Sequence, residues 1–325
     1  MSLINGYVGT YASPDAPGTY RFTLDADTGV LSAPALVYPQ ANTKYAAWHG
    51  GLLATVTESG GRSGLALLDA SDPGCPVLDS VLTEDATACF LTWHEGRIYS
   101  ANYHDGHVLI YEPACGGLRL VRRLEIGAEA GCHQALFHGR WLLVPCLCLD
   151  QVRIFDLENG LAPAGTLNFP AGTGPRHGVF NADHTRLYLV SEKSNQLFTY
   201  AVDGLSFTPV QADTLLPPDC AGRADAAAVR LSPDGKTLYV SVRGADLITV
   251  FRLEDGLPAL LQHASSLGRD PWDLMLPPDG RFLLASDRRS DALISFNLEP
   301  DGSVGPERSR LTIPQCVGLT LETMQ

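Results

Sequence analysis

Hydrophobic and polar residues alternate along this chain in short runs, and one arrangement of runs returns at a nearly constant interval. Such alternation is typical of β-strands with one buried face. The most regular run of each unit begins in turn at Gly6, Leu53, Ile98, Leu142, Leu187, Leu238 and Leu283. Successive units are therefore 44 to 51 residues apart. Self-similarity at this period predicts a repeat protein.

Each unit contains further alternating runs before and after the most regular one. Tight polar turns join the runs, and the Asp-Gly pairs in SPDGK and PPDGR favour hairpins because such turns need positive φ. A fourth, weaker strand fits the stretches VYPQ, ADTLLP and LLQHASS. Four strands per repeat, seven times over, predict an all-β fold, the seven-bladed β-propeller.

The two ends of the sequence predict how the ring of blades closes. The chain begins directly on the second strand of its first unit, and CVGLTL at 316–321 resembles the missing first strand. We therefore expect the C-terminal strand to complete the first blade. A doubly wound fold would need helical periodicity between the strands, which this sequence does not show. The prediction is one β-propeller domain over residues 1–325.

Composition and charge narrow the class of protein. With 45% hydrophobic and 18% charged residues, the chain can bury a large core. It has no apolar run of membrane-spanning length and no basic, apolar leader, so we expect a cytoplasmic protein. A formal charge of −13 argues against nucleic-acid and membrane partners, because both require a basic face. An anionic small substrate fits if cations gather locally, and we expect a monomer or weak homodimer.

The eight cysteines lie within apolar, strand-like runs, so we expect reduced, buried thiols. Cys146 and Cys148 are expected on one face of a strand, where packing is favoured over metal binding because further soft ligands are missing. No cluster has metal-ligand spacing that stands out, and no Gly-rich phosphate loop precedes a helix. The sequence therefore predicts neither a metal nor a cofactor.

Equivalent positions of successive blades form rings around the central channel. The ring at the start of the first strands reads Lys44, Cys89, His133, His177, Ala228, Asp273 and Val317. The ring five residues into the second strands reads Tyr11, Glu58, Tyr103, Leu147, Glu192, Arg243 and Arg288. The turn between these two strands lies at one rim of the propeller, so both rings lie at the other rim.

One hairpin, PRHGVFNADHTRLYLVSE, carries an arginine near one end and a carboxylate at the other. If the chain doubles back at NADHT, Arg176 and Glu192 lie about one strand spacing, ~5 Å, apart. With His133 and Arg243 they form a group suited to binding an anion or polarising a carbonyl. Alternation places His177 on the opposite face of its strand, behind this group.

We assign catalysis to His133, Arg176, Glu192 and Arg243, and substrate binding to His177, Glu58, Tyr103 and Arg288. The alternative is a wet, charge-lined channel without catalytic function. Asp287, Arg289 and Asp291 are expected to be solvated loop charges.

Several stretches resemble the lactonase family of seven-bladed propellers. They are AGCHQALFHGRWLLVP, GPRHGVF, YLVSEKSNQLFTY, AAVRLSPDGKTLYVSVRGADLITVF and PWDLMLPPDGRFLLASDRRSDALISF. The resemblance runs over essentially the whole chain, and it implies an active site of one histidine, two arginines and one glutamate, which match His133, Arg176, Glu192 and Arg243. The chain departs from the family at Ser191 and Val242, where Asn is frequent, at Arg230 for His, and at Trp272 for Arg.

The resemblance implies a lactone hydrolase, with 6-phospho-D-glucono-1,5-lactone, an anionic sugar lactone of the pentose phosphate pathway, as the expected substrate. Either His133 or Glu192 would accept a proton from water, and we favour His133 because two arginines should depress the pKa of Glu192. The alternatives are an enzyme that closes a muconate into a lactone and a non-catalytic propeller that binds sugars or proteins.

Overall fold

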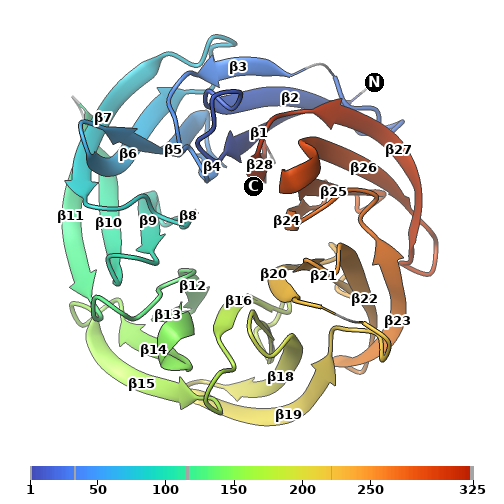
Figure 1. Cartoon of the computed structure of the whole chain (residues 1–325). Coiled ribbons are helices and arrows are strands. Elements are labelled where there is room, and N and C mark those ends of the chain that lie inside the picture. Colours follow the sequence, from blue (N-terminus) through green and yellow to red (C-terminus); the bar gives the residue numbers. More distant parts are fainter. Residues whose placement is uncertain (1, 33, 115–116, 221, 323–325) are drawn as a thin grey trace.

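In a computed structural model, described for residues 2–32, 34–114, 117–220 and 222–322, the chain forms seven four-stranded antiparallel sheets around a central channel (Figure 1). The strands nearest the axis are β28 (Cys316–Leu321), β4 (Ala46–His49), β8 (Phe90–His94), β12 (Leu136–His138), β16 (Pro175–Phe180), β20 (Asp225–Leu231) and β24 (Pro271–Met275). The predicted seven-bladed propeller is confirmed.

The second strands of the sheets are β1 (Leu3–Thr10), β5 (Leu52–Ser59), β9 (Arg97–Asn102), β13 (Trp141–Cys146), β17 (Arg186–Ser191), β21 (Thr237–Arg243) and β25 (Phe282–Asp287). The third strands are β2 (Thr19–Asp25), β6 (Arg62–Asp69), β10 (His107–Ala114), β14 (Gln151–Asp156), β18 (Gln196–Asp203), β22 (Leu247–Glu254) and β26 (Ala292–Leu298). The outermost strands are β3 (Ala35–Tyr38), β7 (Val77–Glu84), β11 (Gly117–Glu125), β15 (Ala162–Asn168), β19 (Ser206–Thr214), β23 (Leu257–Ser265) and β27 (Val304–Thr312).

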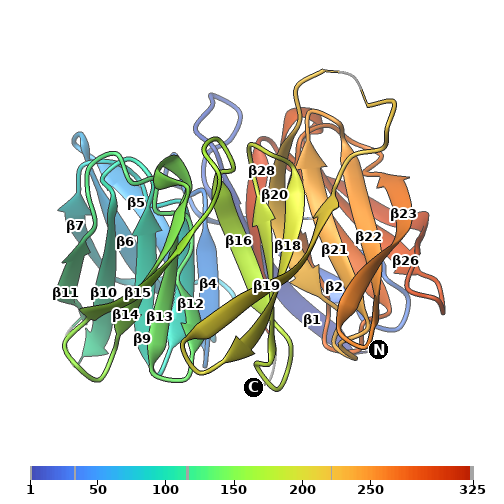
Figure 2. The ribbon, with the colours of Figure 1, turned by 90° about the horizontal axis from the view of Figure 1, so that it is seen from below.

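The last strand closes the ring, as the sequence predicts. β28 pairs antiparallel with β1, with Tyr7 opposite Thr320. The side view in Figure 2 shows both ends of the described chain toward the same face of the propeller. A terminal strand bound into the first blade leaves that sheet as wide as the others.

Apolar side chains fill the spaces between neighbouring blades. Equivalent tyrosines reach from one blade to the next: the hydroxyl of Tyr188 donates to the carbonyl of Gly256 at 2.9 Å, and that of Tyr239 donates to Gly302 at 2.8 Å. Their rings are buried and their polar ends are satisfied, which is how tyrosine is stably accommodated in a core. The repeated sequence therefore produces the same contact between successive blades.

Two 3₁₀ turns interrupt the loops at one rim, η1 (Leu147–Leu149) and η2 (Arg288–Ser290). Among the described residues, no helix has the length and apolar character needed to cross a bilayer.

The turn η1 corrects one expectation. Cys146 ends β13 and is buried, whereas Cys148 lies in η1 and is exposed, so the two thiols do not share a strand face. All seven described cysteines are free, but Cys89 and Cys220 are only partly buried, so the prediction of uniformly buried thiols is wrong. The eighth, Cys115, lies outside the described residues.

Candidate active site

A cavity of about 180 Å³ lies at the mouth of the channel, where the first strands begin and the second strands end. Its walls are formed by Tyr11, Lys44, Cys89, Tyr103, His104, His133, Glu192, Arg243 and Trp272. Every one of the seven blades contributes at least one of these residues. The propeller therefore brings distant parts of the chain to one small site.

Glu192 is the acidic centre of this site, and three cations hold it. Its carboxylate accepts from Nε of Arg176 at 3.0 Å and Nη2 of Arg243 at 2.8 Å, and from Nζ of Lys193 at 2.7 Å. Burial alone would raise the pKa of Glu192, but the charges of Arg176 and Arg243 outweigh it and hold the pKa well below its usual range. Glu192 is therefore ionised throughout the neutral range.

Arg176 reaches Glu192 because of an irregularity in the hairpin. Pro175 pairs with Ser191 and His177 pairs with Val190, so Arg176 is the extra residue of a β-bulge. Its side chain is almost completely buried, and Nη1 also donates to the carbonyl oxygen of Ala227 in the next blade at 2.5 Å. The two ends of the hairpin do meet, and Arg176 lies beneath Glu192 rather than in the cavity wall.

The same bulge determines where His177 lies. Its ring is buried 5.1 Å from the ring of His133, and its Nδ1 is 3.3 Å from Nη1 of Arg176. His177 therefore supports the site from below, and its role in substrate binding stays a prediction.

His133 lines the cavity as a neutral imidazole. Burial and the nearby charge of Arg176 hold its pKa well below the usual value. Nδ1 is buried and has no hydrogen-bond partner in the described chain. The backbone N–H of His133 donates to the carbonyl of Pro145 at 3.0 Å, which fixes the residue against β13. A buried ring with an unpartnered nitrogen is suited to proton transfer.

Aromatic rings support the cations on one side of the mouth. The guanidinium of Arg243 lies 4.4 Å from the centre of the Trp272 ring, and that of Arg288 lies 4.5 Å from Tyr11 and 5.1 Å from Trp272. Arg288 stands behind these rings, 3.8 Å from the carboxylate of Asp270. Cation–π contacts of this kind orient an arginine without neutralising its charge.

The remaining predicted residues separate into two groups. Tyr103 lines the cavity beside His133, with 6.0 Å between ring centres. Glu58 does not line it, and its carboxylate accepts from Nδ2 of Asn42 at 3.0 Å. The predicted residues that line the cavity are thus Tyr103, His133, Glu192 and Arg243, and those that do not are Glu58, Arg176, His177 and Arg288.

The residues predicted for the site do not include three that line the cavity: Lys44, Tyr11 and Trp272. Lys44 and Tyr11 belong to the two predicted rings, so their position was signalled. Trp272 occupies a second β-bulge, because Pro271 pairs with Asp287 and Asp273 pairs with Ser286. It is the counterpart of Arg176, and that equivalence could have identified it.

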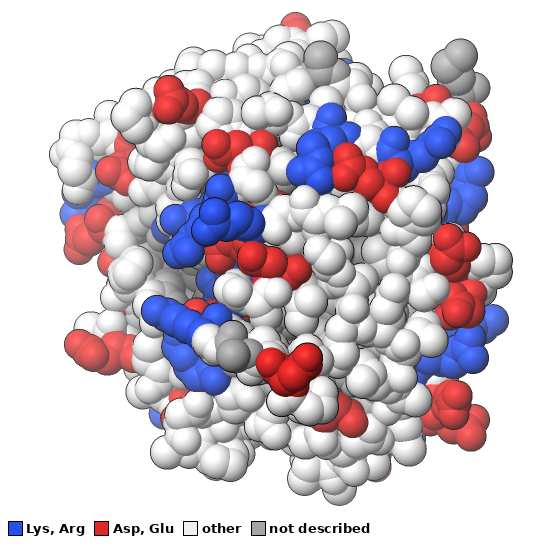
Figure 3. All heavy atoms as spheres, turned by 45° about the vertical axis from the view of Figure 1, so that its right-hand side comes forward, with Lys and Arg blue, Asp and Glu red and all other residues white. Residues whose placement is uncertain are grey.

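Positive charge exceeds negative charge in this site. Among the described residues that line the cavity, Lys44 and Arg243 are the cations and Glu192 is the one carboxylate, and Arg176 and Lys193 also pair with Glu192. Basic and acidic side chains are interspersed over the outer surface in the view of Figure 3, and the chain as a whole carries −13. A local cationic basin in an acidic protein favours an anionic ligand.

Asp287 corrects another expectation, because it is fully buried rather than a solvated loop charge. Oδ1 accepts from the hydroxyl of Ser266 at 2.6 Å, while Oδ2 has no partner in the described chain. Burial raises the pKa of Asp287 to about 7. Arg289 is exposed as predicted. Asp291 is half-buried and accepts the backbone N–H of Gln315 at 2.7 Å.

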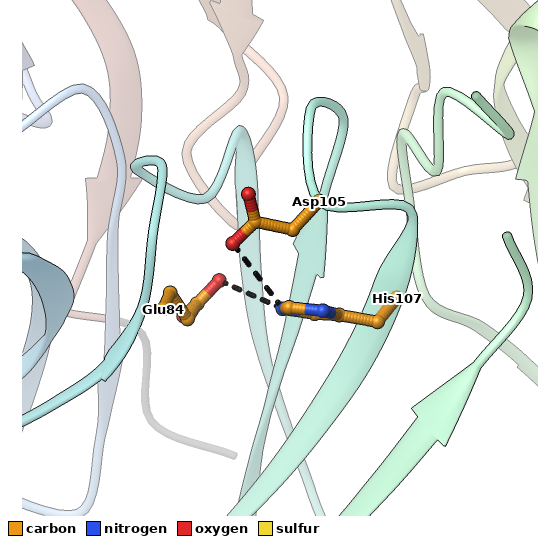
Figure 4. A group of neighbouring side chains, drawn as sticks. All are labelled: Glu84, Asp105 and His107. Atoms are coloured by element: carbon orange, nitrogen blue, oxygen red, sulfur yellow. Dashed lines mark hydrogen bonds and ion pairs between the residues drawn. The ribbon is translucent and has the colours of Figure 1, made fainter. Parts of the chain in front are cut away.

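Figure 4 shows a second cluster, between blades two and three, whose atoms are close enough to hold a metal ion: Glu84, Asp105 and His107. Nε2 of His107 lies 3.3 Å from Glu84 and 3.9 Å from Asp105, and Nδ1 lies 3.2 Å from Nη1 of Arg123. With Nδ1 accepting from this cation, Nε2 carries the hydrogen and donates to Glu84. In that tautomer Nε2 has no lone pair to offer a metal ion, which favours a hydrogen-bonded network at this cluster.

A larger cavity of about 650 Å³ lies at the opposite rim, between the hairpin turns of blades six and seven. Its walls include the acidic residues Asp234, Glu254, Asp279, Glu299 and Asp301. It lacks the buried histidine and paired arginines of the channel mouth, which therefore remains the candidate site.

Comparisons with known proteins identify relatives of this chain. The family model described as "Lactonase, 7-bladed beta-propeller" matches residues 5–320. The chain is 27% identical over 299 residues to the 6-phosphogluconolactonase of Bacillus subtilis, covering 85% of each chain.

Solved structures show the same architecture. A protein from Lactobacillus plantarum is 26% identical, with a TM-score of 0.91 over 99% of this chain and 100% of that one. A periplasmic gluconolactonase of Pseudomonas aeruginosa is 24% identical, with a TM-score of 0.89 over 100% of both chains, a likeness that concerns the fold. The chain belongs to the lactonase family of seven-bladed β-propellers.

Proposed function

We propose that this protein hydrolyses a sugar lactone that carries an anionic group, with 6-phospho-D-glucono-1,5-lactone as the preferred substrate. The observation that carries the proposal is one cavity lined by ionised Glu192, Arg243 and the neutral ring of His133, with Arg176 paired to Glu192 from outside the cavity wall. Membership of the lactonase family and the relative named 6-phosphogluconolactonase support it.

Arg243 is the group best placed to stabilise the oxyanion that forms when water attacks the lactone carbonyl. Its Nε donates to the carbonyl of Asp225, and its Nη2 contacts Glu192. Nη1 has no partner in the described chain, so its two N–H groups are free to face the substrate. Fixed donors aimed at a developing negative charge are the largest single contribution to many acyl-transfer reactions.

His133 is proposed as the proton acceptor. Water adds to C1 of the lactone and gives one proton to the imidazole, which leaves an oxyanion on C1. The C1–O5 bond then breaks, and the imidazolium returns the proton to O5, so the product is the open hydroxy acid. Glu192 stabilises the transient imidazolium and, with Arg176, holds Arg243 in place.

The test is hydrolysis of freshly prepared 6-phosphogluconolactone above its spontaneous rate. Arg243→Ala should lower kcat/KM by about 100-fold or more. Arg252→Ala is the matched control, because Arg252 is an exposed arginine of the same blade at the opposite rim, and it should leave the rate unchanged.

Turnover of muconate alone would contradict the proposal in favour of a lactonising enzyme. Inertness toward both substrates in a folded protein would favour a binding propeller. A cytoplasmic location, a role in the pentose phosphate pathway and a monomer or weak homodimer are parts of the same proposal.

A further inference from the structure

Lys44 is a cation at the cavity wall without an anionic partner. Its side chain is nearly buried, and Nζ donates to the carbonyl oxygen of Thr87 at 3.3 Å, the one hydrogen bond it forms within the described chain. No described carboxylate forms an ion pair with it, whereas Arg176 and Arg243 both bind Glu192. An ammonium has three N–H donors, so two of them remain for a ligand.

The position of Lys44 is fixed by the backbone around it. The N–H of Gly318 donates to the carbonyl of Lys44 at 3.2 Å. A Cβ at Gly9 would lie 2.0 Å from the carbonyl oxygen of Thr43 and 2.9 Å from the carbonyl carbon of Lys44. Only glycine allows this approach of β1, and the lysine is held at the point where blades one and two meet.

An unpaired, nearly buried ammonium is costly, because burial penalises its charge. Burial lowers the pKa of Lys44, and the more distant carboxylates of Glu58 and Glu84 compensate only in part. The ring of Tyr11, 5.4 Å away, offers a cation–π contact but no counter-charge. An anionic group of a ligand in the cavity would supply the counter-charge for Lys44.

Lys44 also lies across the channel from the proposed chemistry. It precedes β4 in blade two, while Glu192 directly follows β17 of blade five and Arg243 ends β21 of blade six, on the far side of the ring (Figure 1). A molecule that contacts both walls must carry its reacting carbonyl at one end and its negative group at the other. A sugar lactone with the carbonyl at C1 and an anionic group at C6 has this form.

We propose that Lys44 binds the anionic group of the substrate at the end remote from the lactone carbonyl, and so selects phosphorylated over uncharged lactones. The inference rests on the proposed lactonase function and specifies the class of substrate. It also leaves Arg176 as a positioning residue for Glu192, because the Arg176 side chain does not line the cavity.

The experiment compares 6-phosphogluconolactone with glucono-1,5-lactone, which has the same carbonyl but no phosphate. Lys44→Met should raise KM for the phosphorylated lactone about 10- to 100-fold with kcat changed less than about 3-fold, the range expected for loss of one charge-assisted hydrogen bond. KM for the uncharged lactone should stay within about 2-fold. Lys44→Arg should restore most of the selectivity, and Lys236→Met, at the opposite rim, should change neither substrate.

Equal losses on both lactones, or no change on either, would overturn the inference while leaving lactonase activity established. If the wild-type protein hydrolyses neither lactone, the proposed function fails, and calorimetry then tests Lys44 without turnover. Lys44→Met should weaken binding of 6-phosphogluconate about 10-fold or more and leave gluconate unaffected. Equal affinity of the wild type and Lys44→Met for 6-phosphogluconate would refute the inference.

Discussion

Glu192, which is partly buried, and Glu84, which is fully buried, are two carboxylates in different surroundings. Glu192 is held by three cations and faces a cavity. Glu84 accepts from Ser100, Asn102 and Tyr111. It also contacts His107 (Figure 4). A carboxylate that several hydrogen-bond donors surround stabilises the junction of two blades. One that holds arginines beside an open space organises charge for a ligand.

Replacing each carboxylate by an amide should distinguish Glu192 from Glu84 by catalytic activity. Glu192→Gln keeps the shape of the side chain but removes the charge that binds Arg176 and Arg243, so kcat/KM for the phosphorylated lactone should fall about 100-fold or more. Glu84→Gln, the matched isosteric change, should stay within about 3-fold. Similar losses in both variants would erase the distinction between the two carboxylates.

The free energy of unfolding should depend more on Glu84 than on Glu192. Glu84→Ala leaves several buried donors without an acceptor, so urea unfolding followed by tryptophan fluorescence should report a loss of about 2 kcal/mol. The exposed Glu254→Ala in blade six serves as control and should change the free energy of unfolding by less than about 0.5 kcal/mol. A loss that small for Glu84→Ala would mean that its hydrogen bonds stabilise nothing.

The stability of the fold should depend on pH through a third carboxylate, Asp287. It is buried and forms no ion pair with a cation of the described chain. Its folded pKa, raised to about 7, exceeds the unfolded value of about 3.9, so the folded state binds the extra proton between them. Its contribution is therefore favourable below about pH 4 and is lost as the pH rises through 7.

Asp287→Asn should remove this dependence. Between pH 5 and pH 8 the wild type should lose about 2 to 3 kcal/mol more unfolding free energy than the variant, measured by urea unfolding at both pH values. Glu192, with a lowered pKa, contributes above its unfolded value and is lost only on acidification through its folded pKa, so it adds no slope in this range. Parallel curves for wild type and variant would show that Asp287 is charged or solvated.

The smallest effect concerns the aromatic support of Arg243. Trp272→Leu removes the ring over the guanidinium and should lower kcat/KM about 5-fold, the size of one cation–π contact, while Trp272→Phe should retain most of the activity. A steady-state assay with both variants measures this. Equal rates for Trp272→Leu and the wild type would show that Arg243 is oriented without the Trp272 ring.

Much of the architecture could be predicted because alternation and period are local properties of the sequence. Seven units, their hairpins and the closing strand follow from them, and so does the meeting of Arg176 with Glu192. The bulges at Arg176 and Trp272 could not be predicted, because they depend on how strands pair. Strict alternation read through these bulges gave no reason to select Trp272 for the site.

Contacts between blades could not be predicted from the sequence either. The network around Glu84 joins the end of β7 to β9 and β10, and no spacing along the chain announces it. Asp287 lies in a run of charged residues and looked solvated, but it is the last residue of β25 and its side chain turns inward to Ser266. The unpaired state of Lys44 is visible only once its neighbours are known.

The decisive experiment is a crystal structure with bound 6-phosphogluconate. We expect the phosphate within hydrogen-bond distance of Nζ of Lys44 and the carboxylate beside Nη1 of Arg243, with the sugar chain across the channel mouth. An empty channel mouth at saturating ligand, or a molecule bound instead at the opposite rim beside Lys236 and Arg252, would contradict it.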